Sequence, residues 1–108
     1  MLTEWVEWDV WLARVKFEET DEESMRPVLL TNQDDTIKIY CLKMTSHEPR
    51  RGEYSLIRWV EAGLRMQTTV RVEKLLYLET DRFIHRIGHL DPADIIGIQQ
   101  IINRTHIR

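Results

Sequence analysis

The sequence predicts a mainly β protein in which a small, strongly curved antiparallel sheet or barrel is followed by a C-terminal helix. Two observations support this prediction. About six short stretches either alternate apolar and polar residues or form brief apolar runs bounded by turn residues, which is typical of strands. The final stretch repeats isoleucine at helical spacing. At 108 residues the chain suits one domain, residues 1–108, built around a single core.

The first half of the chain contains three predicted strands. Residues Val10 to Phe17 alternate apolar and basic side chains, and the acidic run from Glu18 to Ser24 is predicted to be a loop. A short apolar run opened by Pro27 forms the second strand, and residues 32–35 form a turn. Thr36 to Met44 is the third strand, and apolar residues on both of its faces predict a central or covered position.

Arg26 stands directly before the proline that opens the second strand. Proline has no N–H and a preset φ, so Pro27 suits the first residue of a strand or an edge. Arg26 is then expected at the mouth of the sheet, held by rigid backbone. A phosphate-binding arginine belongs at such a place, but so does an ordinary solvated arginine, and the position alone does not decide between them.

Three further strands are predicted in the second half, separated by a loop over residues 45–52 and a turn over residues 61–64. They cover Tyr54 to Trp59, Thr68 to Leu78, and Phe83 to Leu90, the last as a strand or a short strand–helix mixture.

A helix over about residues 91–104 is predicted from its start signals and its apolar stripe. Asp91 can cap it, Pro92 suits its first position, and Asp94 favours the positive end of the helix dipole. The stripe that should lie on the sheet or close one end of a barrel consists of Ile95, Ile98 and Ile102.

Composition excludes several classes of protein. Hydrophobic residues make up 43% and charged residues 31% of the chain, which is typical of soluble globular proteins. No apolar run approaches the roughly 20 residues of a membrane span, and the N-terminus does not resemble a signal peptide. Cys41 is the single cysteine, which excludes an internal disulfide. We therefore expect a cytoplasmic protein without membrane contact. Its net charge of −3 does not indicate nucleic-acid binding, although the arginines concentrate in the second half of the chain.

The sequence lacks the motifs of several common enzyme classes, and a set of polar residues remains as candidates for catalysis. The sequence has no glycine-rich phosphate loop and no Gly-x-Ser-x-Gly turn. His85 and His89 are expected on a strand, where a spacing of four places them about 13 Å apart, so no metal site is predicted. The remaining candidates for chemistry are Arg26, Thr45, Ser46, Arg71 and Glu73, with His47 as the histidine in a loop beside reactive groups.

The order of motifs along almost the whole chain resembles that of a known family. The matching pieces are Asp9-Val10-Trp11-Leu12, Arg26-Pro27-Val28-Leu29, Thr45-Ser46, Trp59 to Leu64, Val70-Arg71-Val72-Glu73 and Ile87-Gly88-His89-Leu90. Each piece is weak alone, but together and in this order they resemble the MazF/PemK-like toxins of bacterial type II toxin–antitoxin modules.

The resemblance implies a small SH3-like barrel, usually dimeric, that cleaves single-stranded RNA at specific sequences without a metal or other cofactor. In that reaction the 2′-hydroxyl attacks the neighbouring phosphorus, and a cognate antitoxin neutralises the enzyme. Arg26 and Thr45 match the family's active-site residues, and Arg71 with Glu73 matches a basic–acidic pair that some members place in or near the site. Ser46 and His47 are possible supporting residues.

Physical chemistry supports these roles unequally. A guanidinium fork strongly stabilises the negative charge of a pentacovalent phosphorus in a dry, preorganised site, and the Thr45 hydroxyl can add a donor. Arg71 and Glu73 lie two apart on one strand, about 7 Å apart on the same side, so both can border one groove. Arginine is a poor general acid because its pKa exceeds about 12, so it needs strong help from its environment, or another donor such as His47 takes this role.

Two other functions are compatible with the sequence. A non-catalytic SH3-like interaction module would bind a partner through apolar grooves, and the acidic run with the tryptophan-rich N-terminus favours it. A gyrase-poisoning toxin has a similar fold, but the chain ends in Thr105-His106-Ile107-Arg108 rather than the Trp-Gly-Ile tail expected there.

Overall fold

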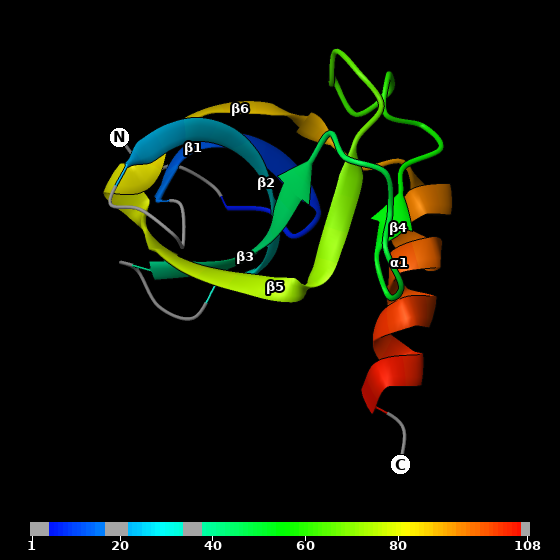
Figure 1. The fold of residues 1–108 in the computed structure, drawn as a ribbon. Coiled ribbons are helices and arrows are strands. Elements are labelled where there is room, and N and C mark those ends of the chain that lie inside the picture. Colours follow the sequence, from blue (N-terminus) through cyan, green and yellow to red (C-terminus); the bar gives the residue numbers. More distant parts are fainter. Residues whose placement is uncertain (1–4, 17–21, 34–37, 107–108) are drawn as a thin grey trace.

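One curved antiparallel sheet and a C-terminal helix make up the fold in the computed structural model, which describes residues 5–16, 22–33 and 38–106. The strand order is β4-β5-β3-β2-β1-β6. Figure 1 shows the strands curving around a common interior, with α1 beside β4 at one end. The bounds are β1 Asp9–Lys16, β2 Glu23–Gln33, β3 Lys38–Thr45, β4 Tyr54–Ser55, β5 Thr69–Glu79, β6 Phe83–His89 and α1 Pro92–His106, with a 3-10 turn at Thr80–Arg82. The predicted mainly β fold with a C-terminal helix is confirmed.

Strand β2 begins earlier than the sequence predicts. It starts at Glu23, so Arg26 and Pro27 lie inside the strand and the predicted loop over Glu18 to Ser24 is wrong at its end. Pro27 is tolerated because the β2–β3 ladder ends at Val28, and β2 is an edge on that side beyond this point. Residues 32 and 33 also belong to β2 instead of a turn. Predicted features at residues 17–21 and 34–37 lie outside the described residues.

The predicted strand from Tyr54 to Trp59 is also wrong over most of its length. Only Tyr54 and Ser55 pair, opposite Val70 and Thr69 of β5. The chain then leaves the sheet through turns and returns at Thr69. Hydrophobicity alone suggests a strand, but after Ser55 the chain forms a loop, from which Leu56 and Ala62 are buried in the core while Ile57 is exposed.

Apolar residues are buried in two clusters, one on each face of the curved sheet. The inner cluster lies within the curve of β1, β2 and β3, and Trp5, Trp11 and Phe83 form its aromatic part. Cys41 belongs to it, and burial raises the pKa of its thiol to about 12, so it is an inert core residue as predicted. The outer cluster joins Val10, Leu29, Leu42, Met44 and Val70 to α1 and to the segment that follows β4.

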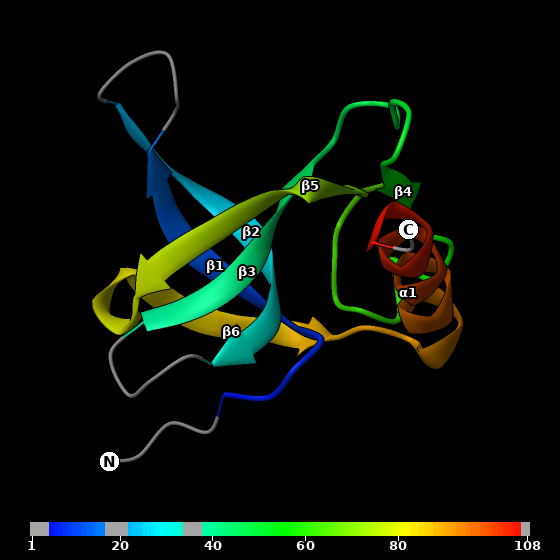
Figure 2. The ribbon, with the colours of Figure 1, turned by 90° about the horizontal axis from the view of Figure 1, so that it is seen from below.

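Helix α1 begins and packs as its sequence predicts. The Asp91 side chain accepts the Ala93 N–H at 3.0 Å, so Asp91 caps the helix. Ile95, Ile98 and Ile102 pack on the outer cluster. Figure 2, in which α1 is seen nearly end-on, shows the helix next to β4 and to one side of the curved strands. The close approach depends on Gly97, because a Cβ there would lie 2.4 Å from the Tyr54 ring. None of the described helices is long and apolar enough to span a membrane.

Residues 56–68 form a loop that covers one end of the outer cluster, and this loop positions the site described below. Its turn at Gly63 has φ +88°, which favours glycine. The Ala62–Gly63 backbone lies directly against β6, because a Cβ at Gly88 would lie 2.2 Å from the Ala62 carbonyl oxygen. On the other side, the N–H groups of Ile57 and Arg58 donate to the buried carboxylate of Asp94 on α1. The loop is therefore held from both sides.

Candidate active site

A cavity of about 690 Å³ lies between the β2–β3 region, strand β6 and the loop of residues 56–68. Its polar lining is cationic: three arginines and one histidine line it, and no aspartate or glutamate of the described residues does. Hydroxyl groups and apolar side chains complete it. The charged and hydroxyl-bearing lining residues are Ser24, Arg26, Thr45, Ser46, Arg65, Thr68, His85 and Arg86. Although the net charge of the chain is −3, this cavity suits an anion.

Arg26 and Thr45, predicted from the sequence as site residues, line this cavity together. In the β2–β3 ladder Val28 lies opposite Lys43, and Arg26 and Thr45 are each two residues further along their strands. The ladder ends at that pair, so Arg26 and Thr45 lie just beyond it, where both residues line the cavity. Arg26 is half-buried, and its Nε donates to Ser24 Oγ at 3.2 Å. The sheet thus brings both predicted residues to one place.

The turn after β3 holds the hydroxyl of Thr45. The His47 N–H donates to Thr45 Oγ1 at 3.3 Å, and the His47 carbonyl accepts the Thr69 hydroxyl at 2.7 Å. Since Thr45 Oγ1 accepts here, its own proton can donate to a ligand. Ser46 lines the cavity beside it, whereas the exposed His47 does not. His47 therefore orders Thr45 through its backbone in this structure.

Arg71 and Glu73 do not line the cavity. Arg71 lies opposite Lys43 in the β3–β5 ladder, and its Nε donates to Glu53 Oε2 at 3.0 Å. Burial raises the pKa of Glu53, but the bond from the Arg50 N–H and the bond and charge of Arg71 outweigh it and lower the pKa below its usual value. Glu73 is exposed. The predicted basic–acidic pair is therefore split, since Glu53 rather than Glu73 is the partner of Arg71.

Strand β6 supplies cavity residues that sequence reasoning did not select. Arg86 is oriented by Asp9, which is buried in β1. Nε and Nη2 of Arg86 donate to the Asp9 carboxylate at 3.0 and 3.4 Å. His89 Nδ1 lies 2.7 Å from the same carboxylate, whereas His85 lines the cavity. The two histidines thus have different surroundings, and the described residues contain no cluster of three His, Cys, Asp or Glu that could hold a metal. Only the β1–β6 pairing reveals Arg86 and His85 as neighbours of the predicted site.

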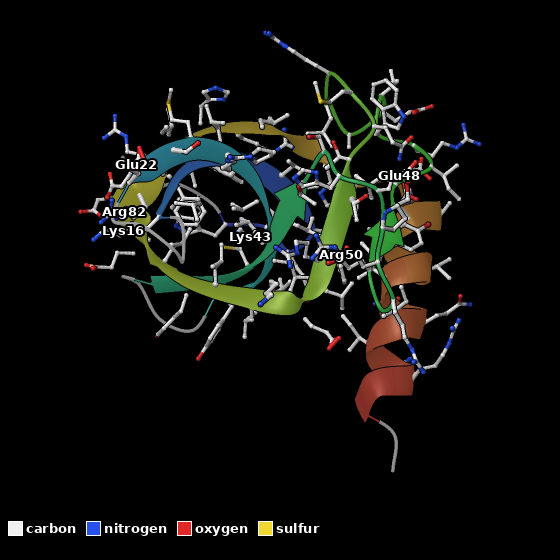
Figure 3. All side chains as sticks on the ribbon, viewed as in Figure 1. Lys16, Glu22, Lys43, Glu48, Arg50 and Arg82 are labelled. Atoms are coloured by element: carbon white, nitrogen blue, oxygen red, sulfur yellow. The ribbon has the colours of Figure 1, made fainter. Side chains whose placement is uncertain are left out.

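The acidic run before Arg26 is partly paired where the structure describes it. Glu23 forms an ion pair with Arg82, and this hydrogen bond is the main cause that lowers the pKa of Glu23. In Figure 3, Lys16, Glu22 and Arg82 gather at the end of the sheet remote from α1, whereas Lys43 and Arg50 lie nearer the helix. Basic side chains therefore offset the acidic charge at this end.

Comparison with known proteins identifies the family. Residues 7–106 match the sequence profile of the PemK-like, MazF-like toxins of type II toxin–antitoxin systems. The chain belongs to this family. The resemblance seen in the ordered motifs is thereby confirmed, and PemK-like, MazF-like membership covers the strands and the helix described above.

Solved structures share this PemK-like, MazF-like fold at low sequence identity. A mycobacterial endoribonuclease in complex with its cognate antitoxin has a TM-score of 0.72 at 12% identity, over 94% of this chain and 93% of that one. A second mycobacterial endoribonuclease has a TM-score of 0.69 at 12% identity, over 92% and 88%. The Mycobacterium tuberculosis toxin MazF-mt6 has a TM-score of 0.69 at 15% identity, over 89% and 93%. No curated protein sequence matches the chain significantly.

Proposed function

We propose that this protein is an endoribonuclease toxin that cleaves single-stranded RNA, such as mRNA in the cytoplasm, at specific sequences. The observation that carries the proposal is the cationic cavity in which Arg26 and Thr45 come together. Family membership and the fold shared with two endoribonucleases and a MazF toxin support it.

The proposed reaction is a transesterification within the RNA. The 2′-hydroxyl attacks the adjacent phosphorus, the bond to the 5′-oxygen breaks, and a 2′,3′-cyclic phosphate and a 5′-hydroxyl result. Arg26 binds the non-bridging oxygens of the phosphate with its guanidinium fork, and the Thr45 hydroxyl donates to the same oxygens. Both donors are fixed by the sheet and the following turn before substrate binds, which is the arrangement that stabilises a charged transition state most.

We propose that the chain acts as a homodimer and that a cognate antitoxin neutralises it. Support for the antitoxin comes from the related endoribonuclease that was solved with its antitoxin. Apolar side chains such as Ile57, Val60 and Ile96 are more than half exposed, and they offer area for a protein partner or a second copy.

The test is cleavage of a single-stranded RNA library by purified protein, with EDTA present in one arm. Wild-type protein is expected to yield 5′-hydroxyl and cyclic phosphate ends with or without EDTA, and to leave matched 2′-deoxy substrates intact. Arg26→Ala and Thr45→Val should each lower the rate by about 10²-fold or more, because each removes a donor to the transition state. Arg104→Ala, an exposed residue of α1 outside the cavity, is the matched control.

Intact RNA with wild-type protein would contradict the proposed activity. So would Arg26→Ala and Thr45→Val variants that both cleave at the wild-type rate. That result would favour the alternative, a catalytically inactive SH3-like interaction module. If EDTA abolishes the activity and added metal restores it, only the metal independence of the reaction is contradicted.

A further inference from the structure

The proposed reaction leaves two proton transfers without a residue, and the first of them removes the proton from the 2′-hydroxyl. The inference below rests on the proposed function. A guanidinium with a pKa above about 12 does not accept a proton near neutral pH, and the hydroxyl of Thr45 or Ser46 is no better as a base. An efficient base has a pKa near the working pH.

The residues that line the cavity include one side chain that is suited to act as the general base. Histidine is the side chain most often used as a general base, and among the described residues that line the cavity His85 is the only histidine, with no carboxylate present as an alternative base. We propose that His85 is the general base that accepts the 2′-hydroxyl proton. His47, which the sequence suggests as a proton donor, does not line the cavity.

The hydrogen bond of His85 sets which ring nitrogen reacts. Its Nδ1 lies 3.2 Å from the carbonyl oxygen of Arg86. A carbonyl only accepts hydrogen bonds, so Nδ1 carries the proton in this contact and the neutral ring keeps its lone pair on Nε2. The side chain is exposed, so a bound nucleotide can reach Nε2. This tautomer is the one that a base needs.

Strand register places His85 two strands from Pro27, the chain neighbour of Arg26. His85 lies opposite Leu12 in the β1–β6 ladder, and Leu12 lies opposite Pro27 in the β1–β2 ladder. The three residues form one row across the sheet, and all three line the cavity. Two interstrand spacings separate His85 from Pro27 by about 10 Å. Arg26, the chain neighbour of Pro27, is opposite Ala13 in the next row, and its link to His85 is that both residues line the same cavity.

The proton and bond changes balance without a co-reactant. Nε2 of His85 takes the proton from the 2′-oxygen as the bond from that oxygen to phosphorus forms. The bond between phosphorus and the 5′-oxygen breaks, and the 5′-oxygen takes a proton from water. His85 then returns its proton to solvent. Arg86, oriented by Asp9, adds positive charge next to the base while the phosphate gains negative charge.

The experiment compares wild-type protein with His85→Gln over pH 5 to 9 on one RNA substrate. For wild-type protein, kcat/KM should rise as the pH increases from 5 and then level off, as expected for a reaction that needs one unprotonated base. His85→Gln should lose that rise and about 10²-fold or more of the plateau rate. Ile84→Gln is the control, since Ile84 precedes His85 on β6, is 40% exposed and does not line the cavity. Circular dichroism of both variants checks the fold.

A second substrate distinguishes a general-base role of His85 from a general-acid role. When sulfur replaces the bridging 5′-oxygen, the leaving group no longer needs a proton, so only the need for a base remains. His85→Gln should stay slow on this substrate. Recovery of the wild-type rate there would overturn the assignment as base, and so would a His47→Gln variant that alone loses the pH-dependent rise.

The outcomes also distinguish this inference from the proposed function. If wild-type protein cleaves RNA and needs Arg26, while His85→Gln keeps its rate and pH profile, only the role of His85 is wrong. If wild-type protein does not cleave RNA at all, the proposed function fails and the role of His85 fails with it.

Discussion

The hydroxyl of Tyr54 donates a 2.8 Å hydrogen bond to Oδ1 of Asp94, which joins β4 to the first turn of α1 across 40 residues of sequence. Asp94 is fully buried, and its two oxygens also accept the N–H groups of Ile57 and Arg58 at 3.0 and 2.8 Å. One carboxylate thus holds the strand, the helix and the start of the loop that forms a wall of the cavity.

Asp94→Asn should lower the free energy of unfolding by about 2 kcal/mol, because an amide offers one acceptor oxygen and turns an NH₂ group toward buried donors. Urea unfolding measures the change. Asp91→Asn is the matched control, since asparagine caps a helix about as well as aspartate and should leave stability nearly unchanged. Equal unfolding curves for the two variants would contradict the anchoring role of Asp94.

Stability at high pH should depend on Tyr54. Burial, followed by the hydrogen bond to Asp94 and its charge, raises the pKa of Tyr54 to about 12 from 10.0. A raised pKa favours folding below the unfolded value and loses that contribution as pH rises through the folded value. Wild-type protein should therefore lose its stability advantage over Tyr54→Phe between pH 10 and 12. An advantage that is constant over this range in chemical unfolding would contradict the shift.

Arg71 should matter more for stability than for cleavage. Glu53 is only 12% exposed as a side chain and faces the Arg71 guanidinium, so Arg71→Ala leaves a mostly buried carboxylate without its charged partner. We expect a loss of about 2 kcal/mol in unfolding free energy at pH 7, with cleavage rates within a few-fold of wild type.

The pH dependence of that loss follows from the lowered pKa of Glu53. A lowered pKa contributes stability above the unfolded value, 4.5, and the contribution disappears as pH falls through the folded value. The difference between wild-type protein and Arg71→Ala should therefore shrink below pH 4.5. A cleavage defect of 10²-fold in a well-folded Arg71→Ala protein would instead support the site role that the sequence suggests.

Gly88→Ala should disturb the cavity through its wall. The new Cβ would meet the Ala62 carbonyl oxygen at 2.2 Å, so the loop must move away from β6. We expect a loss of several-fold or more in cleavage and a lower melting temperature. Gly52→Ala is the comparison: it also adds a methyl group, at φ +82°, but that methyl meets only the flexible Glu73 side chain at 3.2 Å. It should cost about 1 kcal/mol and spare activity.

RNA binding should weaken with salt despite the negative net charge. Three arginines line the cavity, and contacts of each with a phosphate imply a slope of log affinity against log salt of about −2 for single-stranded RNA. Binding of a non-cleavable 2′-deoxy oligonucleotide at several salt concentrations measures the slope. Arg65→Gln should reduce its magnitude by about 0.7. Arg104→Gln should not change it, and an equal change in both variants would place the contacts outside the cavity.

Local patterns predicted the parts of the fold that depend on neighbours in sequence. The cap at Asp91, the isoleucine stripe of α1 and the alternation of β1 are set by nearby residues, and the structure confirms each. Local patterns gave wrong predictions where contacts between residues distant in sequence determine the structure. Pro27 was predicted to open a strand, but pairing with β1 extends β2 back to Glu23. The apolar residues after Ser55 form a covering loop rather than a strand.

The sequence by itself determined the family and a mainly β fold with a C-terminal helix, and it predicted Arg26 and Thr45 as residues that match the family's motif. Tertiary structure decided which charges share a cavity. His85, Arg86 and Arg65 reach it through the β1–β6 pairing and the loop held by Asp94, whereas Arg71 turns to Glu53. The physical reason is that such contacts join residues dozens of positions apart, and no local periodicity encodes which strands become neighbours.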